Sequence, residues 1–136
     1  EASIKFSFNL NIGCPKKYQP SKILLNWVKK YKNKIKVFYN VKSAALNADV
    51  VFTDKVISMN DKVNMAKKIK EFKNFKVNSK VMSYANTDAI FLHCLPRSSE
   101  VSDKVFLGKQ SKVWQQALNR IYVQKSILLY CFEKLR

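Results

Sequence analysis

The chain has 136 residues, 47% of them hydrophobic, which suffices for one domain with a core of its own. It carries 26 lysine and arginine residues against 9 aspartate and glutamate residues, a formal net charge of +17. No apolar run of the sequence is long enough to span a bilayer, which argues against a membrane protein. Three widely spaced cysteines favour a reducing, cytoplasmic compartment over a disulfide framework or a zinc site.

The positive charge raises the question of a nucleic-acid partner. Most of the basic residues are lysines, and they are spread over several segments. Proteins that read nucleic acids usually rely on the bidentate fork of arginine, which occurs here only at Arg97, Arg120 and Arg136. A solvated basic surface is therefore the favoured interpretation, and nucleic-acid binding is the weaker alternative.

Short apolar runs alternate with helical patterns along the chain. In order we expect a strand at 10–13, an amphipathic helix at 23–31, a strand at 35–39, a helix at 41–46, a strand at 49–53, a polar helix at 62–72, a helical turn at 78–84 and a strand at 89–93. The third strand is a nearly continuous apolar run, typical of a strand buried on both faces. The alternation predicts an α/β fold, doubly wound, with a mainly parallel sheet and helices on both faces in three layers.

The two ends of the chain give further expectations. Glu1 enters what looks like the middle of a helix, so we expect a piece of a longer protein whose fold is incomplete at its N-terminus. A long helix is predicted at 113–135, with an apolar stripe along one side. The stripe consists of Trp114, Ala117, Leu118, Ile121, Leu128, Phe132 and Leu135. Such a stripe should pack across a sheet or against a second domain.

Reactive side chains follow two of the predicted strands. Pro96 has no backbone N–H and cannot continue a strand, so the last strand should end at His93 or Cys94. The third strand delivers Asp54 to the same edge, and Ser58 follows it. Open parallel sheets bind their ligands at this carboxyl edge. A carboxylate, a hydroxyl and a thiol placed there could bind the ammonium group of an amino acid and steady an attacking amine.

Each of these residues has a commoner structural role when it is taken alone. Asp54 and Ser58 could cap a turn or a helix, and Cys94 could be a small buried hydrophobe. His93 could be a hydrogen-bonded structural imidazole. Their joint placement at two strand ends nevertheless favours a site. The chain has only 2 glycines, so the sequence offers no glycine-rich nucleotide-binding loop.

Four motifs, in this order, resemble the ornithine carbamoyltransferase family. They are Pro15-Lys16-Lys17-Tyr18-Gln19-Pro20, Asp54-x-x-x-Ser58-Met59, His93-Cys94-Leu95-Pro96 and Asn119-Arg120. The similarity covers nearly the whole chain and concerns the second, L-ornithine-binding domain of that family. It implies transfer of the carbamoyl group from carbamoyl phosphate to the side-chain amine of L-ornithine, which gives citrulline and phosphate. It implies no metal and no organic cofactor.

The resemblance also implies roles on the ornithine side of the site. Asp54, Ser58 and Met59 are expected to hold the α-amino end of L-ornithine. Asp54 and Cys94 are the expected catalytic residues, with Cys94 acting as a polar orienting group and not as a covalent nucleophile.

On the carbamoyl phosphate side, the resemblance implies contacts from four residues. Cys94 and the Leu95 carbonyl are expected beside the carbamoyl group, which Arg120 helps to bind, and His93 is assigned to the same substrate. Arginine suits a phosphate or carboxylate partner because of its planar fork of donors.

Half of the family's enzyme has no counterpart in this sequence. Nothing in it resembles the Ser-Thr-Arg-Thr phosphate loop or the His-Pro-x-Gln segment of the carbamoyl-phosphate domain. Residues 1–136 are therefore expected to be the ornithine-binding domain alone, inactive by itself, from an enzyme that by resemblance is a homotrimer. Asn60 and Leu118 stand where the family usually has glycine and glutamate. Two alternatives stay open: a carbamoyltransferase for another amine or amino acid, and a non-catalytic remnant that serves as a binding or assembly module.

Overall fold

The computed structural model describes residues 1–31, 34–57 and 64–134. The strands are β1 (Leu10–Gly13), β2 (Ile35–Phe38), β3 (Val50–Thr53) and β4 (Ile90–His93). The helices are α1 (Ala2–Lys5), α2 (Lys22–Lys29), α3 (Val41–Ala45), α4 (Met65–Phe72), α5 (Ser79–Met82), α6 (Asp103–Phe106) and α7 (Val113–Lys134), with 3-10 turns η1 (Lys16–Tyr18) and η2 (Lys73–Phe75). The strands lie where the sequence predicts them, and the expected α/β class is confirmed.

The helices begin where short polar side chains can cap them. The side-chain oxygens of Ser21, Asn40, Asn64 and Asn78 each accept a backbone N–H from the first turn of α2, α3, α4 and α5, respectively. The cap at Asn78 confirms the helical turn expected there. The polar helix expected at 62–72 starts at Met65 within the described residues, and its first positions lie outside them.

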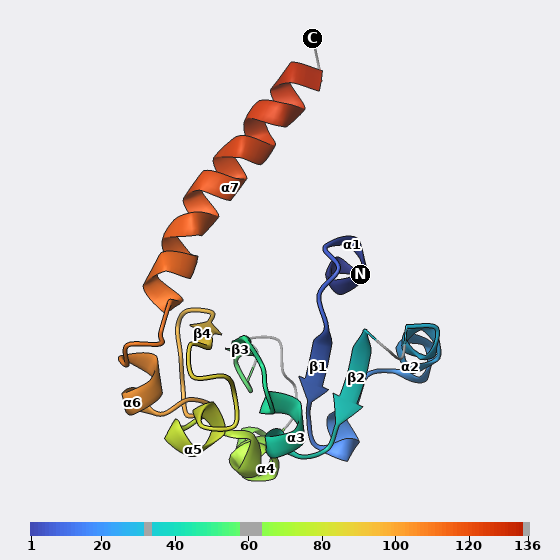
Figure 1. Cartoon of the computed structure of the whole chain (residues 1–136), viewed down its shortest axis with the longest axis vertical. Helices are drawn as coiled ribbons and strands as arrows, with labels where there is room; N and C mark the ends of the chain where they lie inside the picture. Colours follow the sequence, from blue (N-terminus) through green and yellow to red (C-terminus); the bar gives the residue numbers. More distant parts are fainter. Residues whose placement is uncertain (32–33, 58–63, 135–136) are drawn as a thin grey trace.

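The strands are parallel and form two pairs. β1 pairs with β2, and β3 pairs with β4 in a register that places Thr53 opposite His93. Across the molecule the order is β4, β3, β1, β2 (Figure 1). Among the described strands no hydrogen-bonded ladder joins β1 to β3, so the expected single sheet is divided here. The Asn11 side chain instead donates to the Ala44 carbonyl at 3.2 Å, which ties β1 to the end of α3.

The main core lies on the β3–β4 side. Phe91 of β4 and Val113 at the start of α7 are fully buried. The other buried members of the cluster are Ala45, Val51, Val77, Val81, Met82, Val101, Val105 and Phe106. One expectation fails: β3 is not buried on both faces, because Val51 is buried whereas Val50 and Phe52 are 48% and 56% exposed. The alternation shows that β3 has core on one side only.

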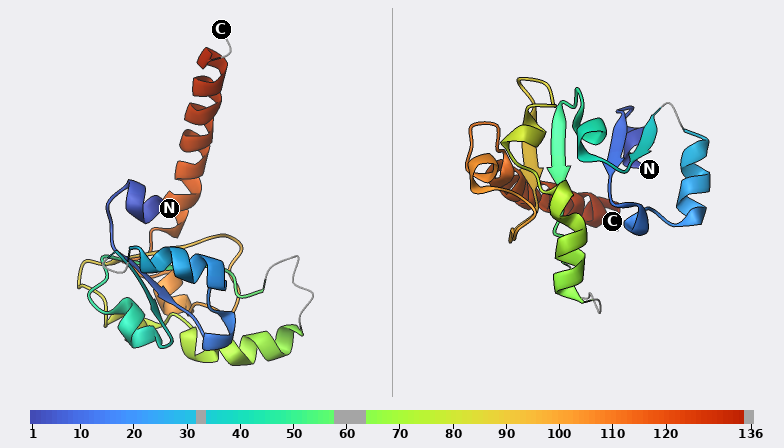
Figure 2. Two further views of the ribbon diagram at one scale, coloured as in Figure 1. Left: turned by 90° about the vertical axis from the view of Figure 1, so that its right-hand side faces the viewer. Right: turned by 90° about the horizontal axis from the view of Figure 1, so that it is seen from below.

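The long helix α7 departs most from its expected packing. Only Val113 of the helix is buried, and the stripe residues Trp114 and Phe132 are 61% and 64% exposed. The helix leaves the body of the domain and runs away from it (Figure 1 and the left view of Figure 2). The expected packing across a sheet or a second domain is absent from the described chain, because no other element of it runs beside the helix. No helix among the described residues combines the length and apolarity needed to cross a membrane.

Candidate active site

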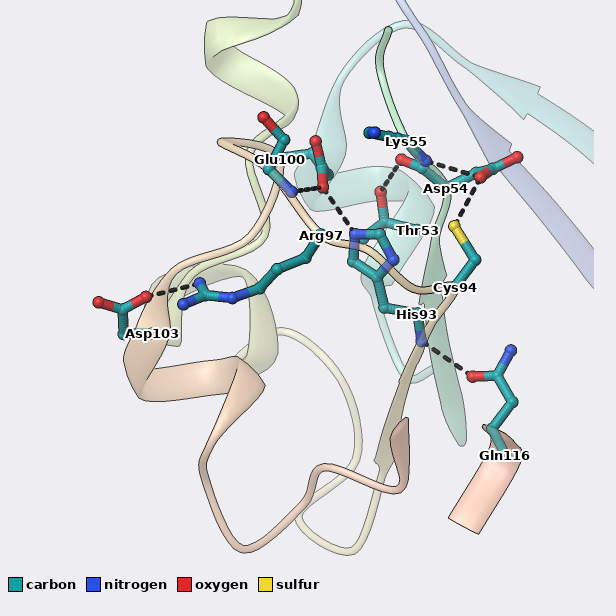
Figure 3. A network of polar contacts seen from close by, with 10 residues as sticks. Thr53, Asp54, Lys55, His93, Cys94, Arg97, Glu100, Asp103 and Gln116 are labelled. Atoms are coloured by element: carbon teal, nitrogen blue, oxygen red, sulfur yellow. Dashed lines mark hydrogen bonds and ion pairs between the residues drawn. The ribbon is translucent and has the colours of Figure 1, made fainter. Parts of the chain in front are cut away.

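The site lies where β3 and β4 end side by side. Asp54 follows β3 and Cys94 follows β4, and the Cys94 thiol donates to Oδ1 of Asp54 at 3.0 Å (Figure 3). The same oxygen accepts the Lys55 backbone N–H at 2.6 Å. The sequence predicts these two side chains at the same edge of the sheet, and the hydrogen bond between them confirms this placement. Their chemical roles stay predictions.

The pair consists of a carboxylate and a neutral thiol. The hydrogen bond from Cys94, together with that from the Lys55 backbone, holds the pKa of Asp54 below its usual value. Burial and the hydrogen bond to Asp54 raise the pKa of the Cys94 thiol. A thiol that resists ionisation is a poor nucleophile. The electrostatics therefore agree with an orienting role for Cys94 and with Asp54 as an acceptor for a substrate amine.

His93 lies behind this pair rather than beside it. Its Nε2 is 2.8 Å from Oε1 of Glu100, and its backbone N–H donates to the Gln116 side chain at 3.0 Å. The ring is fully buried, edge-on to Phe91 and Phe106. Since the imidazole faces the protein interior, these contacts do not favour the predicted binding of carbamoyl phosphate by its side chain. That role stays a prediction.

The loop after Cys94 is held by contacts within the chain. The peptide bond between Leu95 and Pro96 is cis, and the Leu95 side chain is exposed. Arg97 forms an ion pair with Asp103 and lies over the Phe106 ring, 4.6 Å from its centroid. The predicted Leu95 contact would use its carbonyl, at the start of this turn.

A cavity of about 830 Å³ opens beside Asp54. Its wall includes Gly13 at the end of β1, Tyr18 of η1 and Glu100 of the loop after β4. Five lysines also line it: Lys55, Lys68, Lys70, Lys73 and Lys76. A basic cavity with a carboxylate at its margin can receive a ligand that carries both an anionic and an ammonium group.

The other predicted site residues are Ser58, Met59 and Arg120. Ser58 and Met59 lie outside the described residues. Arg120 is exposed on α7, one helical turn beyond Gln116 and so on the side of the helix that contacts His93. Its side chain makes no hydrogen bond or ion pair within the described part of the chain. Its predicted contact with carbamoyl phosphate would have to form with the substrate bound.

Two residues that contact His93 were missed by sequence reasoning. Glu100 is an isolated acid in the loop, seven positions after His93, and that spacing was the only available signal. Gln116 had none, because it lies on a helix whose orientation the sequence does not give.

Together, fold and site define an α/β ligand-binding domain with a carboxylate and a thiol at the carboxyl edge of parallel strands. Residues 1–131 match the family described as "Aspartate/ornithine carbamoyltransferase, Asp/Orn binding domain". The chain belongs to this family of carbamoyltransferase enzymes, as its motifs led us to expect.

The relatives are ornithine carbamoyltransferases. The enzyme of Ruthia magnifica subsp. Calyptogena magnifica is 43% identical over 132 residues, which cover 96% of this chain and 43% of the relative. That of Methanococcus maripaludis is 45% identical over 130 residues, 90% of this chain and 43% of the relative. The crystal structure of the anabolic enzyme from Campylobacter jejuni matches with a TM-score of 0.83 at 37% identity, covering 93% of this chain and 44% of that one. The chain thus spans less than half of the length of these relatives.

Proposed function

We propose that the protein that contains this chain is an ornithine carbamoyltransferase and that this chain supplies its ornithine-binding half. The observation that carries the proposal is the 3.0 Å hydrogen bond between Cys94 and Asp54 at the carboxyl edge of a family domain. L-Ornithine and carbamoyl phosphate are the proposed substrates, and citrulline and phosphate the products. We further propose a cytoplasmic homotrimer, in keeping with the family resemblance, and no metal or organic cofactor.

The proposed chemistry is an acyl transfer between two bound substrates. The neutral side-chain amine of ornithine attacks the carbamoyl carbon, the new C–N bond forms, and the C–O bond to phosphate breaks. Only the uncharged amine has a lone pair for this attack, so the site has to favour that form near the carbonyl. The proton that the amine nitrogen loses as the C–N bond forms can be taken up by the departing phosphate. Holding both reactants in place can supply much of the rate enhancement, and this chain contributes the orientation of the amine.

Asp54 and Cys94 are suited to that task. The Asp54 carboxylate has a second oxygen that can accept a hydrogen bond from a substrate amine or ammonium. The Cys94 thiol, kept neutral by burial and by Asp54, fixes the carboxylate without competing for the carbonyl carbon. In the proposed site Ser58 and Met59 complete the α-amino contacts. Leu95 and Arg120 face carbamoyl phosphate, and the imidazole of His93, which is held on Glu100, lies behind this edge.

The lysines that line the cavity agree with an amino-acid substrate. They can attract the α-carboxylate of ornithine while Asp54 accepts from an amino group. Putrescine has amines at both ends and no carboxylate, so it should lose the attraction of this basic wall. This difference separates an ornithine site from a site for a simple diamine.

Titration of the chain with L-ornithine tests the proposal. We expect binding by calorimetry, and Asp54→Asn should weaken it about tenfold or more through loss of a charge-assisted hydrogen bond. Asp49→Asn is the matched control, since Asp49 lies before the start of β3 and its carboxylate accepts from Asn86 at 2.7 Å. Putrescine should bind more weakly than ornithine. Equal binding of the two amines, or an Asp54→Asn chain with unchanged affinity, would contradict the proposal.

A further inference from the structure

The loop that follows Cys94 is closed at its base by one carboxylate. Oε1 of Glu100 is 2.8 Å from Nε2 of His93, the last residue of β4. The same oxygen accepts the backbone N–H of Ser98, within the loop. One carboxylate oxygen therefore joins the end of the strand to the far side of the turn (Figure 3).

Glu100 is itself fixed by the backbone around it. Its carbonyl accepts the Val77 N–H at 2.9 Å, and the Val77 carbonyl accepts the Ser102 N–H at 2.9 Å. These bonds form a short parallel bridge between Val77 and Val101. The carboxylate thus extends toward His93 from an anchored segment.

The pair is buried, yet it is not fully satisfied. The side chains of His93 and Glu100 are 0% and 2% exposed. His93 Nδ1 and Glu100 Oε2 are buried without a hydrogen-bond partner among the described residues. A buried polar pair with unpaired atoms is a poor means of gaining stability. Such a pair can instead hold a loop in one geometry.

The contact between His93 and Glu100 lies next to the carboxyl ends of β3 and β4, where Asp54 and Cys94 meet. His93 and Cys94 are neighbours in the chain, and their side chains leave it in different directions, one toward Glu100 and the other toward Asp54 (Figure 3). The His93 backbone N–H is also held by Gln116. The ring and the backbone of His93 are thus both held, which fixes the point at which the Cys94 side chain leaves the chain.

We propose that Glu100 is a positioning residue, which acts through His93 to keep the Cys94 thiol on Asp54. The relevance of this positioning role for carbamoyl transfer rests on the proposed function. The effect of Glu100 on Cys94 is independent of that function, since the reactivity of Cys94 can be measured without any substrate. Failure of the positioning and failure of the proposed activity are therefore distinguishable.

The groups around the Cys94 thiol determine how its reactivity should change when its contact with Asp54 is lost. Asp54 faces it from the loop after β3, together with the Lys55 backbone N–H, and His93 precedes it on β4. Burial and Asp54 both disfavour the thiolate, which is the form that reacts with alkylating agents. A Cys94 freed from these contacts should ionise more readily and react faster.

The test is the rate of alkylation of Cys94 by iodoacetamide as a function of pH, followed by peptide mass spectrometry. The chain carries its own references: Cys131 is exposed on α7, and Cys14 is buried near the end of β1. Glu100→Leu removes the acceptor, and Glu100→Gln keeps a weaker one of the same size. Asp103→Asn is the matched control, because it breaks the Arg97 ion pair of the same region without touching His93.

We expect Glu100→Leu to speed alkylation of Cys94 about tenfold and to move its pH profile to lower pH. Glu100→Gln should have a smaller effect in the same direction, and Asp103→Asn should have none. Cys14 should stay protected and Cys131 unchanged throughout. If Glu100→Leu exposes Cys14 as well, the chain has unfolded and Glu100→Gln decides. Wild-type rates at Cys94 in a folded Glu100 variant, or an equal gain in Asp103→Asn, would overturn the proposal.

Discussion

The β3–β4 half of the domain and helix α7 contain similar apolar residues with opposite fates. Phe91 of β4 is completely buried, whereas Phe132 of α7 is 64% exposed. The first is surrounded by α5, α6 and the neighbouring strand. The second extends from the body on a helix that, among the described residues, is buried only at its start. Burial is thus decided by what the chain places opposite a residue, and not by the residue's own hydrophobicity.

This contrast has a consequence for the site. Asp54, Cys94 and His93 lie at the end of the well-packed strands, so their geometry is supported by a core. Arg120 lies on the helix without such support. The structure therefore gives the carboxylate–thiol pair a fixed arrangement, while Arg120 lies on a part of α7 that the described residues leave exposed.

The largest effect should come from truncating the buried member of the phenylalanine pair. Phe91→Ala is expected to lower the free energy of unfolding by about 3–5 kcal/mol, because it leaves a cavity in the core. Phe132→Ala should change it by less than about 0.5 kcal/mol, since its side chain lies on the surface of α7. Urea unfolding followed by circular dichroism measures both. Similar losses in the two variants would mean that α7 is packed in solution, and the comparison would fail.

The sequence predicted what is determined locally. All four strands were found because short apolar runs end at turn residues, and Pro96 correctly marked the end of β4. The helical turn predicted from Asn78 follows from a side chain that caps its own backbone. The meeting of Asp54 with Cys94 followed from the rule that parallel strands present their carboxyl ends at one edge.

What the sequence could not give depends on contacts between distant segments. The division of the sheet between β1 and β3 and the one-sided burial of β3 are set by packing that no local pattern encodes. The contact of Glu100 with His93 depends on the path of an irregular loop. The free course of α7 has the same origin, because an apolar stripe predicts that a helix packs but not where its partner is.

A second prediction compares the buried carboxylate of Glu100 with the exposed carboxylate of Glu133. The quantity compared is the pH dependence of the free energy of unfolding. Burial is the largest influence on Glu100 and raises its pKa, but the Ser98 N–H and His93 together bring the pKa below its ordinary value. The folded chain therefore holds the charged form more tightly than the unfolded chain. This contribution to stability is complete above the unfolded pKa of glutamate, about 4.3, and is lost as the pH falls through the lower folded value.

Glu100→Gln should accordingly flatten the decline in unfolding free energy between neutral pH and about pH 3. Glu133→Gln is the matched control, because Glu133 is exposed on α7. It should leave the acid limb of the curve as in the wild type. Urea midpoints measured at several pH values give both curves. An unchanged acid limb in Glu100→Gln would show that the carboxylate is not selectively held in the folded state.

The smallest expected effect comes from comparing a buried valine with an exposed valine of the same helix, α7. Val113 is fully buried at its start, whereas Val123 is 56% exposed. Val113→Ala should lower the unfolding free energy by about 1–3 kcal/mol, because it removes buried apolar surface. Val123→Ala should leave the unfolding midpoint unchanged and raise helical circular dichroism slightly, since alanine favours a helix over valine by up to about 0.7 kcal/mol. If Val123→Ala instead lowered the midpoint, and did so more at high protein concentration than at low, its side chain would be buried between copies of the chain. In that case α7 would be exposed in an isolated chain but covered by a second copy of the chain in solution.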